Sequence, residues 1–138
     1  MTRLWGGRFQ SPAADETIAF TSSIAFDARL VHQDCAILAA HARALARAGI
    51  LAEEEAALAA DALKQVADDI ASGAFAVSEA DEDIHSAVER ALLERIPETA
   101  ARLRAGLSRN DRVAAALRLW LKDAIADLTA RLGGLIET

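Results

Sequence analysis

The chain has 138 residues, which is enough for one domain with a substantial buried core. It is 53% hydrophobic but only 4% aromatic, and it is rich in alanine and leucine, so we expect an all-α fold rather than a sheet. The net charge of -6 excludes a typical nucleic-acid-binding surface, and the single cysteine excludes a disulfide within the chain.

The N-terminal stretch contains Gly6, Gly7 and Pro12 and shows no sustained helical periodicity, which predicts an extended arm over about residues 1–23. This arm is expected either to pack on a partner or to be a mobile tail. It lacks the apolar core of a secretion signal, and no stretch approaches the roughly 18 apolar residues of a membrane span. We therefore expect a cytoplasmic protein whose partners are small molecules or other subunits, not nucleic acid or membrane. Cys35 lies in a helical pattern and is interpreted as a buried, inert thiol.

Two helices are predicted next. Apolar residues recur at helical spacing from Asp27, a suitable N-cap, to Gly49, which suits a C-terminus with positive φ. His41 lies on this apolar stripe, and we interpret it as a core or interface histidine rather than a ligand. The second helix is expected to start at the acidic run 53–55, which a helix N-terminus favours, and to end at Gly73.

The acidic run 81–83 predicts the start of a third helix, and Pro97 ends it because proline disfavours helix at the preceding residue. On this helix His85 and Glu89 are four residues apart and share a face, so they could bind a metal or move a proton. The alternative is a structural polar row, exposed or at an interface. A metal site requires three or more protein ligands, and Asp81 is the only other candidate on that face, so no metal site is predicted.

A short connection at 98–106 leads to Ser-Arg-Asn-Asp at residues 108–111, directly ahead of a long apolar-periodic run at 113–136. A helix start offers unpaired N–H groups and a partial positive charge, which suit a carboxylate or phosphate. The arginine and asparagine there could bind the same anion. The simpler interpretation is a capped helix, with Ser108 or Asn110 as the N-cap.

The apolar stripe of the last helix steps by three and four residues over roughly six turns, as in a helix of a bundle. The rest of the chain contains few segments that could pack against this apolar stripe. We therefore predict self-association through this helix or a C-terminal remainder that covers it. Gly133 and Gly134 cost about 1 to 2 kcal/mol in a helix interior, which predicts fraying near the end.

Several segments match a known pattern in order and spacing: residues 4–9 (Leu-Trp-Gly-Gly-Arg-Phe), 21–27, 81–89, 106–113 and 117–120. Together they resemble the N-terminal part of argininosuccinate lyase, in the fumarase/aspartase superfamily. The match spans nearly the whole chain, and the first motif combined with the Ser-Arg-Asn-Asp core is specific within that superfamily.

This resemblance implies an all-helical protein with a small N-terminal domain, here 1–107, that includes the arm at about 1–23. Residues 108–138 would then start a long helix of a central bundle shared by four subunits, in a cytoplasmic homotetramer. The implied reaction is the reversible elimination of argininosuccinate to arginine and fumarate in arginine biosynthesis, without metal or organic cofactor.

The resemblance also implies site residues by position. In the family a base removes a proton next to a carboxylate, and donors that stabilise the resulting charge lower the barrier. Sites combine segments of three subunits, and the base is expected outside this chain, so none of its residues is assigned as catalytic and the 138 residues alone are predicted to be inactive. The substrate-binding residues implied are Ser23, Arg109 and Asn110, and the residues lining the site are Asp83, His85 and Ser108.

Two positions depart from the usual family pattern His-Thr-Gly-Arg-Ser-Arg-Asn-Asp-Gln. Leu107 replaces a guanidinium with an alkyl chain, and Arg112 replaces an amide with a cation. Two alternatives therefore remain. One is a non-catalytic helical association module or truncated structural relative of the lyase. The other is a superfamily lyase acting on adenylosuccinate or fumarate, against which the Leu-Trp-Gly-Gly-Arg-Phe start argues.

Overall fold

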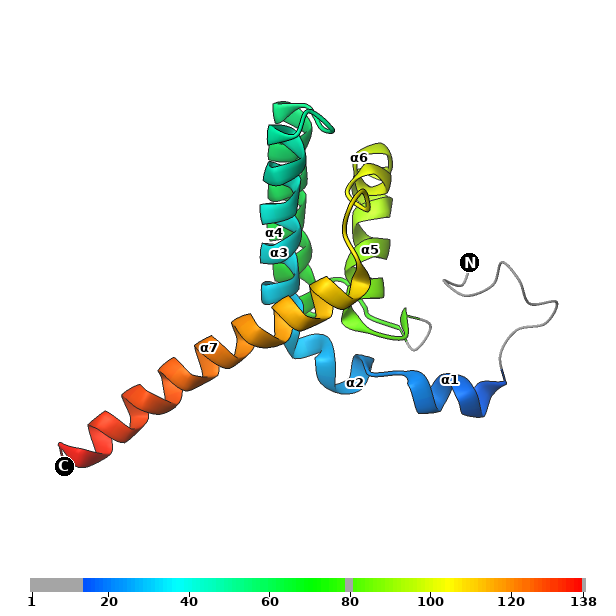
Figure 1. Cartoon of the computed structure of the whole chain (residues 1–138). Coiled ribbons are helices and arrows are strands. Elements are labelled where there is room, and N and C mark those ends of the chain that lie inside the picture. The colour runs from blue at the N-terminus through cyan, green and yellow to red at the C-terminus, as the bar shows by residue number, and fades with distance from the viewer. Residues whose placement is uncertain (1–13, 79–80, 138) are drawn as a thin grey trace.

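The computed structural model describes residues 14–78 and 81–137, and every regular element within them is helical (Figure 1). The expected all-α fold is confirmed. In chain order the elements are α1 (Asp15–Thr21), α2 (Ile24–Asp27), the 3-10 turn η1 (Ala28–Leu30), α3 (Val31–Arg47), α4 (Glu53–Ser72), α5 (Ile84–Arg95), α6 (Pro97–Arg102) and α7 (Arg109–Ile136).

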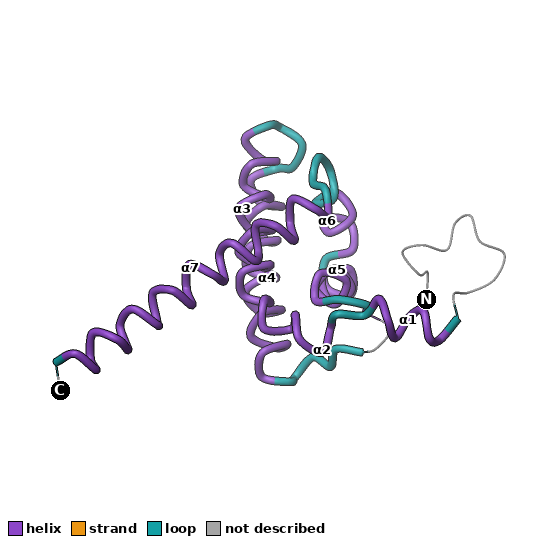
Figure 2. Tube along the Cα trace, turned by 60° about the horizontal axis from the view of Figure 1, so that its bottom comes forward, coloured by secondary structure: helices purple, strands orange, loops and turns teal. Residues whose placement is uncertain are grey.

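The core lies among α3, α4, α5 and α6. Helices α3 and α4 form an antiparallel pair, and α5 packs beside it (Figures 1 and 2). Helices α3, α4 and α5 each bury residues spaced three and four apart, so one stripe of each faces the core. Many of the buried residues of α4 are alanines, whose small side chains allow the helix backbones to approach closely. The buried residues of α4 are Ala56, Ala59, Ala62, Leu63, Val66 and Ala67.

The predicted helix ends agree with the structure at three positions. Gly49 and Gly73 have φ angles of 70° and 79°, the left-handed conformation that ends a helix most easily with glycine. Helix α5 ends just before Pro97, which becomes the first residue of α6. At the start of α4, Glu55 accepts a hydrogen bond from the Ala52 N–H at 2.9 Å.

His41 and Cys35 occupy the structural positions expected of them. The Nε2 atom of His41 lies 2.9 Å from the carbonyl oxygen of Ala105, so the imidazole is hydrogen-bonded within the fold. Cys35 is buried in the core. Burial, and then the neighbouring Asp34 carboxylate, raise the pKa of the Cys35 thiol to about 12.

The N-terminal region differs from the prediction. The prediction of an extended arm over about residues 1–23 is wrong for 15–21, which form α1. Residues 1–13 lie outside the described residues. Asp27 is not the N-cap of the first long helix, because α2 and η1 lead directly into α3 and the Val31 N–H already bonds the Ala28 carbonyl. The Asp27 carboxylate instead accepts the Ile84 N–H of α5 at 3.0 Å.

The chain between α5 and the final helix also contains more helix than predicted, because α6 occupies much of the connection expected at 98–106. Helix α7 then continues through Gly133 and Gly134 to Ile136, so the predicted fraying is not observed. Its first turns lie against α3, and the rest extends away from the other helices (Figure 1).

The outer part of α7 carries an uncovered apolar face. Within this helix only Arg112 and Ala116 are buried. The predicted self-association or C-terminal cover, and the division at 107, stay predictions. Within the described ranges, no helix combines the length and apolar character needed to cross a membrane. The exposed large apolar residues of α7 are Val113, Leu117, Leu119, Leu121, Ile125, Leu128, Leu132, Leu135 and Ile136.

Candidate functional site

The candidate site is built around the start of α7. Ser108 has extended backbone angles, φ -81° and ψ 144°, and its Oγ accepts the Asn110 N–H at 3.2 Å. Ser108 is therefore the N-cap, as one of the two predicted choices. Asp111 lies in the first turn, where the helix dipole favours a negative charge. The capped start fixes the direction in which the next side chains leave the helix.

Arg109 points from this start onto the first turn of α5. Its Nη2 donates to Asp83 Oδ1 at 2.5 Å and to Ser86 Oγ at 2.7 Å, and its Nη1 lies 3.6 Å from Glu89 Oε1. The side chain is still 28% exposed, so a ligand can reach a guanidinium that is already oriented. The structure thus brings together Arg109 and Asp83, two of the residues singled out from the sequence.

Asp83 has two structural roles. It is the N-cap of α5, accepting the Ser86 N–H at 2.8 Å, and it holds Arg109. Burial would raise the pKa of Asp83, but the bonds from Arg109 and the Ser86 N–H outweigh burial and lower that pKa. Asp83 is therefore a carboxylate near neutral pH and acts as an acceptor.

Ser23 is connected to the same end of α5. Its Oγ donates to Asp27 Oδ2 at 2.6 Å, and Asp27 Oδ1 accepts the Ile84 N–H. The carbonyl of Glu82, a residue with a φ of 52°, accepts the N–H groups of Ser23 and Ile24 at 2.7 and 3.2 Å and the Ser22 Oγ at 3.1 Å. One carbonyl therefore ties the segment containing Ser23 to the loop that precedes α5.

Asn110 differs from the other predicted residues. Its N–H takes part in the cap, but its exposed side chain lies outside the hydrogen-bonded cluster of described residues. It stands next to Arg109 at the helix N-terminus, where an anion would meet both residues.

His85 is buried, which contradicts the interpretation of an exposed polar row. It is only 3% exposed, and its Nδ1 lies 2.8 Å from Asp34 Oδ1 (α3). Glu89, one turn further along α5, is partly exposed. Asp81, the third candidate ligand of the metal hypothesis, instead binds Arg90 at 2.8 Å. In the described part of the chain, no three His, Cys, Asp or Glu side chains form a group able to hold a metal ion.

Sequence reasoning missed the buried ion pair behind the site. Arg112 is 3% exposed and donates through Nε and Nη2 to both oxygens of Asp34, which is fully buried. Its Nη1 donates to Glu89 at 2.7 Å. One signal was available for Asp34, because it lies on the apolar stripe of α3, three residues after Val31. A carboxylate at a core position indicates a buried partner.

The pKa of Asp34 reflects two opposing effects. Burial raises it, while hydrogen bonds from His85 and Arg112 and the guanidinium charge lower it by more, so the net direction is downward. Asp34 is thus an ionised carboxylate inside the domain.

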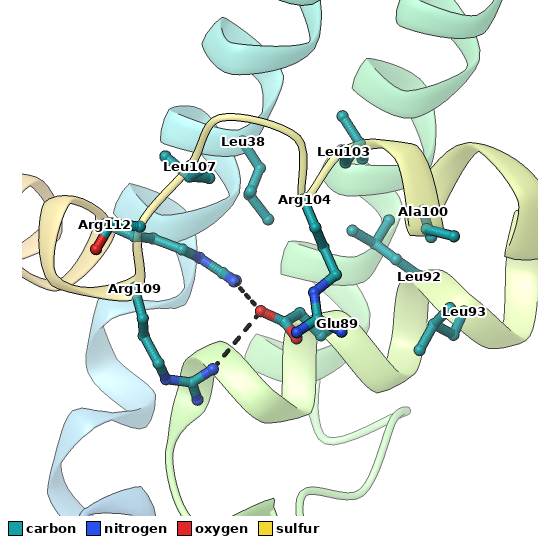
Figure 3. Close-up of a pocket in the computed structure, with 12 residues that line it drawn as sticks. Leu38, Glu89, Leu92, Leu93, Ala100, Leu103, Arg104, Leu107, Arg109 and Arg112 are labelled. Carbon is teal, nitrogen blue, oxygen red and sulfur yellow. Dashed lines mark hydrogen bonds and ion pairs between the residues drawn. The ribbon is translucent and has the colours of Figure 1, made fainter. Parts of the chain in front are cut away.

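A cavity of about 460 Å³ opens beside Arg109, between α5 and the loop that enters α7 (Figure 3). Its lining combines apolar side chains with the charged groups of Glu89, Arg104, Arg109 and Arg112, which suits a small molecule with an anionic group and an aliphatic part. Leu107 packs on the core and is one of the apolar residues of the lining, so the alkyl chain at this departure is accommodated. Figure 3 shows Glu89 between the two guanidinium groups of Arg109 and Arg112.

Comparison with known proteins gives relatives over most of this chain. Argininosuccinate lyase of Rhodococcus jostii (strain RHA1) is 48% identical over 128 residues, which cover 92% of this chain and 27% of that protein. Argininosuccinate lyase of Rhodococcus opacus (strain B4) is 49% identical over 123 residues, 88% of this chain and 26% of that protein. The enzyme of Corynebacterium jeikeium (strain K411) bearing the same name is 42% identical over 135 residues, 97% of this chain and 28% of that protein.

The chain thus spans about a quarter of the length of these relatives. A family model described as lyase matches residues 7–138, which include every contact of the site above. On this match and these relatives, the chain belongs to the lyase family.

Proposed function

We propose that this chain forms one wall of the active site of an argininosuccinate lyase. The reaction would eliminate fumarate from argininosuccinate and release arginine. A base takes a proton from the succinyl carbon next to a carboxylate, and the bond between the neighbouring carbon and the guanidino nitrogen then breaks. Negative charge builds on the carboxylate oxygens, so oriented donors at that place lower the barrier.

The observation that carries this proposal is the placement of Arg109. Asp83 and Ser86 fix its guanidinium at the N-terminus of a long helix, and part of it remains open to solvent. Holding the donor before the substrate arrives reduces the reorganisation needed during reaction. The names of the relatives support argininosuccinate as the substrate.

In this proposal Arg109 and Asn110 bind substrate carboxylates, and Ser23 contacts the succinyl part. Asp83 orients Arg109, Ser108 starts the helix, and His85 lines the site. The base and the remaining walls come from residues outside these 138. We propose that they are brought by further chain and by other subunits in a cytoplasmic homotetramer, with the exposed face of α7 as part of the assembly surface.

The test is an assay of fumarate release from argininosuccinate by the complete polypeptide that contains residues 1–138. Replacing Asn110 with Ala, or Arg109 with Lys, should lower kcat/KM by about 10²-fold to 10³-fold, as for loss of one oriented donor to developing charge. Arg131→Lys, on the exposed outer part of α7, is the matched control and should leave kcat/KM unchanged.

Complementation of an arginine auxotroph provides the independent biological test. Growth is expected with the wild-type gene and not with N110A. Good expression without growth would contradict the proposed activity. Turnover by the 138-residue chain alone that disappears in N110A would contradict the placement of the base elsewhere.

A second candidate is a helical association module without catalysis. The uncovered apolar face of α7 favours it, because such a face serves assembly equally well. Stable oligomers in analytical ultracentrifugation, together with no fumarate release by the complete polypeptide, would select this candidate over the lyase.

A further inference from the structure

Behind the site, two groups that can carry a positive charge contact the buried carboxylate of Asp34. They are the guanidinium of Arg112 and the imidazole of His85. Asp34 Oδ1 accepts Arg112 Nε at 2.5 Å and lies 2.8 Å from His85 Nδ1. Arg112 also bonds the other Asp34 oxygen and the backbone carbonyl of His85, the latter at 3.3 Å. The guanidinium and the imidazole therefore lie side by side against one carboxylate.

The charges around His85 come from four helices. Asp34 of α3 and Arg112 of α7 contact it directly, and Asp27 of α2 binds the N–H of the residue before it. The rim of the cluster adds Glu89 on its own helix, with Asp83 at the start of that helix paired to Arg109 of α7. The rim groups are partly solvated. Among the enclosed groups, the Asp27 carboxylate accepts the Ser23 hydroxyl and the Ile84 N–H, whereas the Asp34 carboxylate is already paired with the Arg112 guanidinium.

We propose that Arg112 supplies the positive charge that Asp34 requires and thereby keeps His85 neutral, with its proton on Nδ1 and its lone pair on Nε2. Protonating His85 would place a second cation beside the guanidinium on the same carboxylate oxygen, which like-charge repulsion opposes. An ionised Asp34 accepts hydrogen bonds only, so Nδ1 is the donor and the ring tautomer is fixed. Arg112 is then a positioning residue that acts through Asp34.

The consequence for the site rests on the proposed function, in which His85 lines the substrate-binding wall. A His85 with a bare Nε2 offers a hydrogen-bond acceptor to a ligand N–H or O–H, whereas an imidazolium offers only donors. Arg112 also takes part of the Glu89 charge, since Glu89 Oε1 lies 2.7 Å from Arg112 and 3.6 Å from Arg109. This sharing leaves the Arg109 cation less neutralised toward a carboxylate ligand.

The test measures the protonation of the two ring nitrogens of His85 directly. It uses ¹⁵N NMR of the full chain labelled with [¹⁵N]histidine at pH 7. His85 is assigned as the signal that disappears in H85Q. In the wild type we expect one protonated and one unprotonated ring nitrogen. In R112Q both nitrogens should be protonated, because Asp34 then draws its counter-charge from His85. R112K keeps the charge and should restore the wild-type pattern.

The matched control is R109Q, which removes a cation of the rim that does not bind Asp34, and it should keep the wild-type pattern. An imidazolium in the wild type, or an unchanged ring in a folded R112Q, would overturn the proposal. If R112Q does not fold, the wild-type spectrum still tests the proposal, because an imidazolium there would overturn it. The readout does not require turnover, so absence of lyase activity would defeat the proposed function while leaving this result intact.

Discussion

Helix α7 has two parts with opposite relations to solvent. In its first two turns it buries a charged residue, Arg112, and an alanine, Ala116. Beyond them it exposes leucine and isoleucine side chains, such as Leu128 at 57%. Ion pairs with α3 and α5 fix the start of the helix and thereby place Arg109. In the outer part Asp123 accepts a hydrogen bond from Gln33 of α3 at 2.8 Å, and the turns beyond Asp123 rely mainly on their own backbone hydrogen bonds and helix propensity.

The largest expected contrast between the two parts comes from one substitution made in each. Arg112→Met removes the guanidinium from the buried Asp34 and leaves only His85 to supply a counter-charge, and breaking such a buried pair costs about 3 to 5 kcal/mol of unfolding free energy. Arg131→Met removes a pair with Asp127 that is 76% exposed at the arginine, so its effect should stay within about 0.5 kcal/mol. Urea unfolding measures both variants. Equal losses would remove the distinction between the parts.

Leucine truncation gives the next contrast. Leu63 lies in the core and is 1% exposed. Its replacement by Ala should lower the unfolding free energy of the protein by about 2 to 5 kcal/mol. Leu128→Ala should change the unfolding free energy of the isolated chain by about 0.5 kcal/mol or less. A large loss at Leu128 would indicate that the outer face is covered in solution, and sedimentation would then reveal the assembly.

Acidification should lower the unfolding free energy of the protein. The pKa values of Asp34, Asp81 and Asp83 are lowered because hydrogen bonds and arginine charges outweigh the opposing effect of burial. Stability from such groups is present above the ordinary carboxyl pKa of about 4 and is lost as pH falls through the lower folded-state value.

The contribution of these three carboxylates to the unfolding free energy should therefore be level from about pH 7 to 5 and decline below about pH 4. Each pKa unit of lowering contributes about 1.4 kcal/mol. Urea titrations across this pH range measure the effect, and stability that increases on acidification would contradict the assignment.

Glycine replacement gives the smallest effect. Gly133 lies in the outer part of α7, and an added Cβ there meets nothing within 4 Å. Gly133→Ala should favour the helical state by about 0.5 to 1 kcal/mol, visible as slower amide hydrogen exchange near the end of α7. Gly73→Ala is the control of opposite sign, because its φ of 79° is strained for alanine. Faster exchange in G133A would contradict this prediction.

Local signals predicted much of the fold correctly. Gly49, Gly73 and Pro97 end helices for reasons contained in a few residues, and Ser108 caps α7 in the same way. Short helices were missed. Helix α1 has seven residues, too few for a periodic pattern to emerge, so its conformation could not be predicted from spacing.

The site could be predicted only in part. Arg109 and Asp83 were identified by resemblance and do meet, although their roles toward substrate remain predictions. The Asp34 and Arg112 pair was missed because its members are 78 residues apart in sequence and no local rule links them. The same pairing explains the departure at Arg112, where a cation replaces an amide and finds a buried carboxylate.

The carbonyl of Glu82 has a consequence for the time course of folding. It binds three donors of residues 22–24, and its partner Ser22 lies 60 residues earlier in the chain. At ribosomal rates of about 5 to 20 residues per second, the earlier segment is made roughly 3 to 12 seconds before its acceptor exists. The segment that carries Ser23 must therefore wait, and that corner of the site is completed only after the loop before α5 has been synthesised.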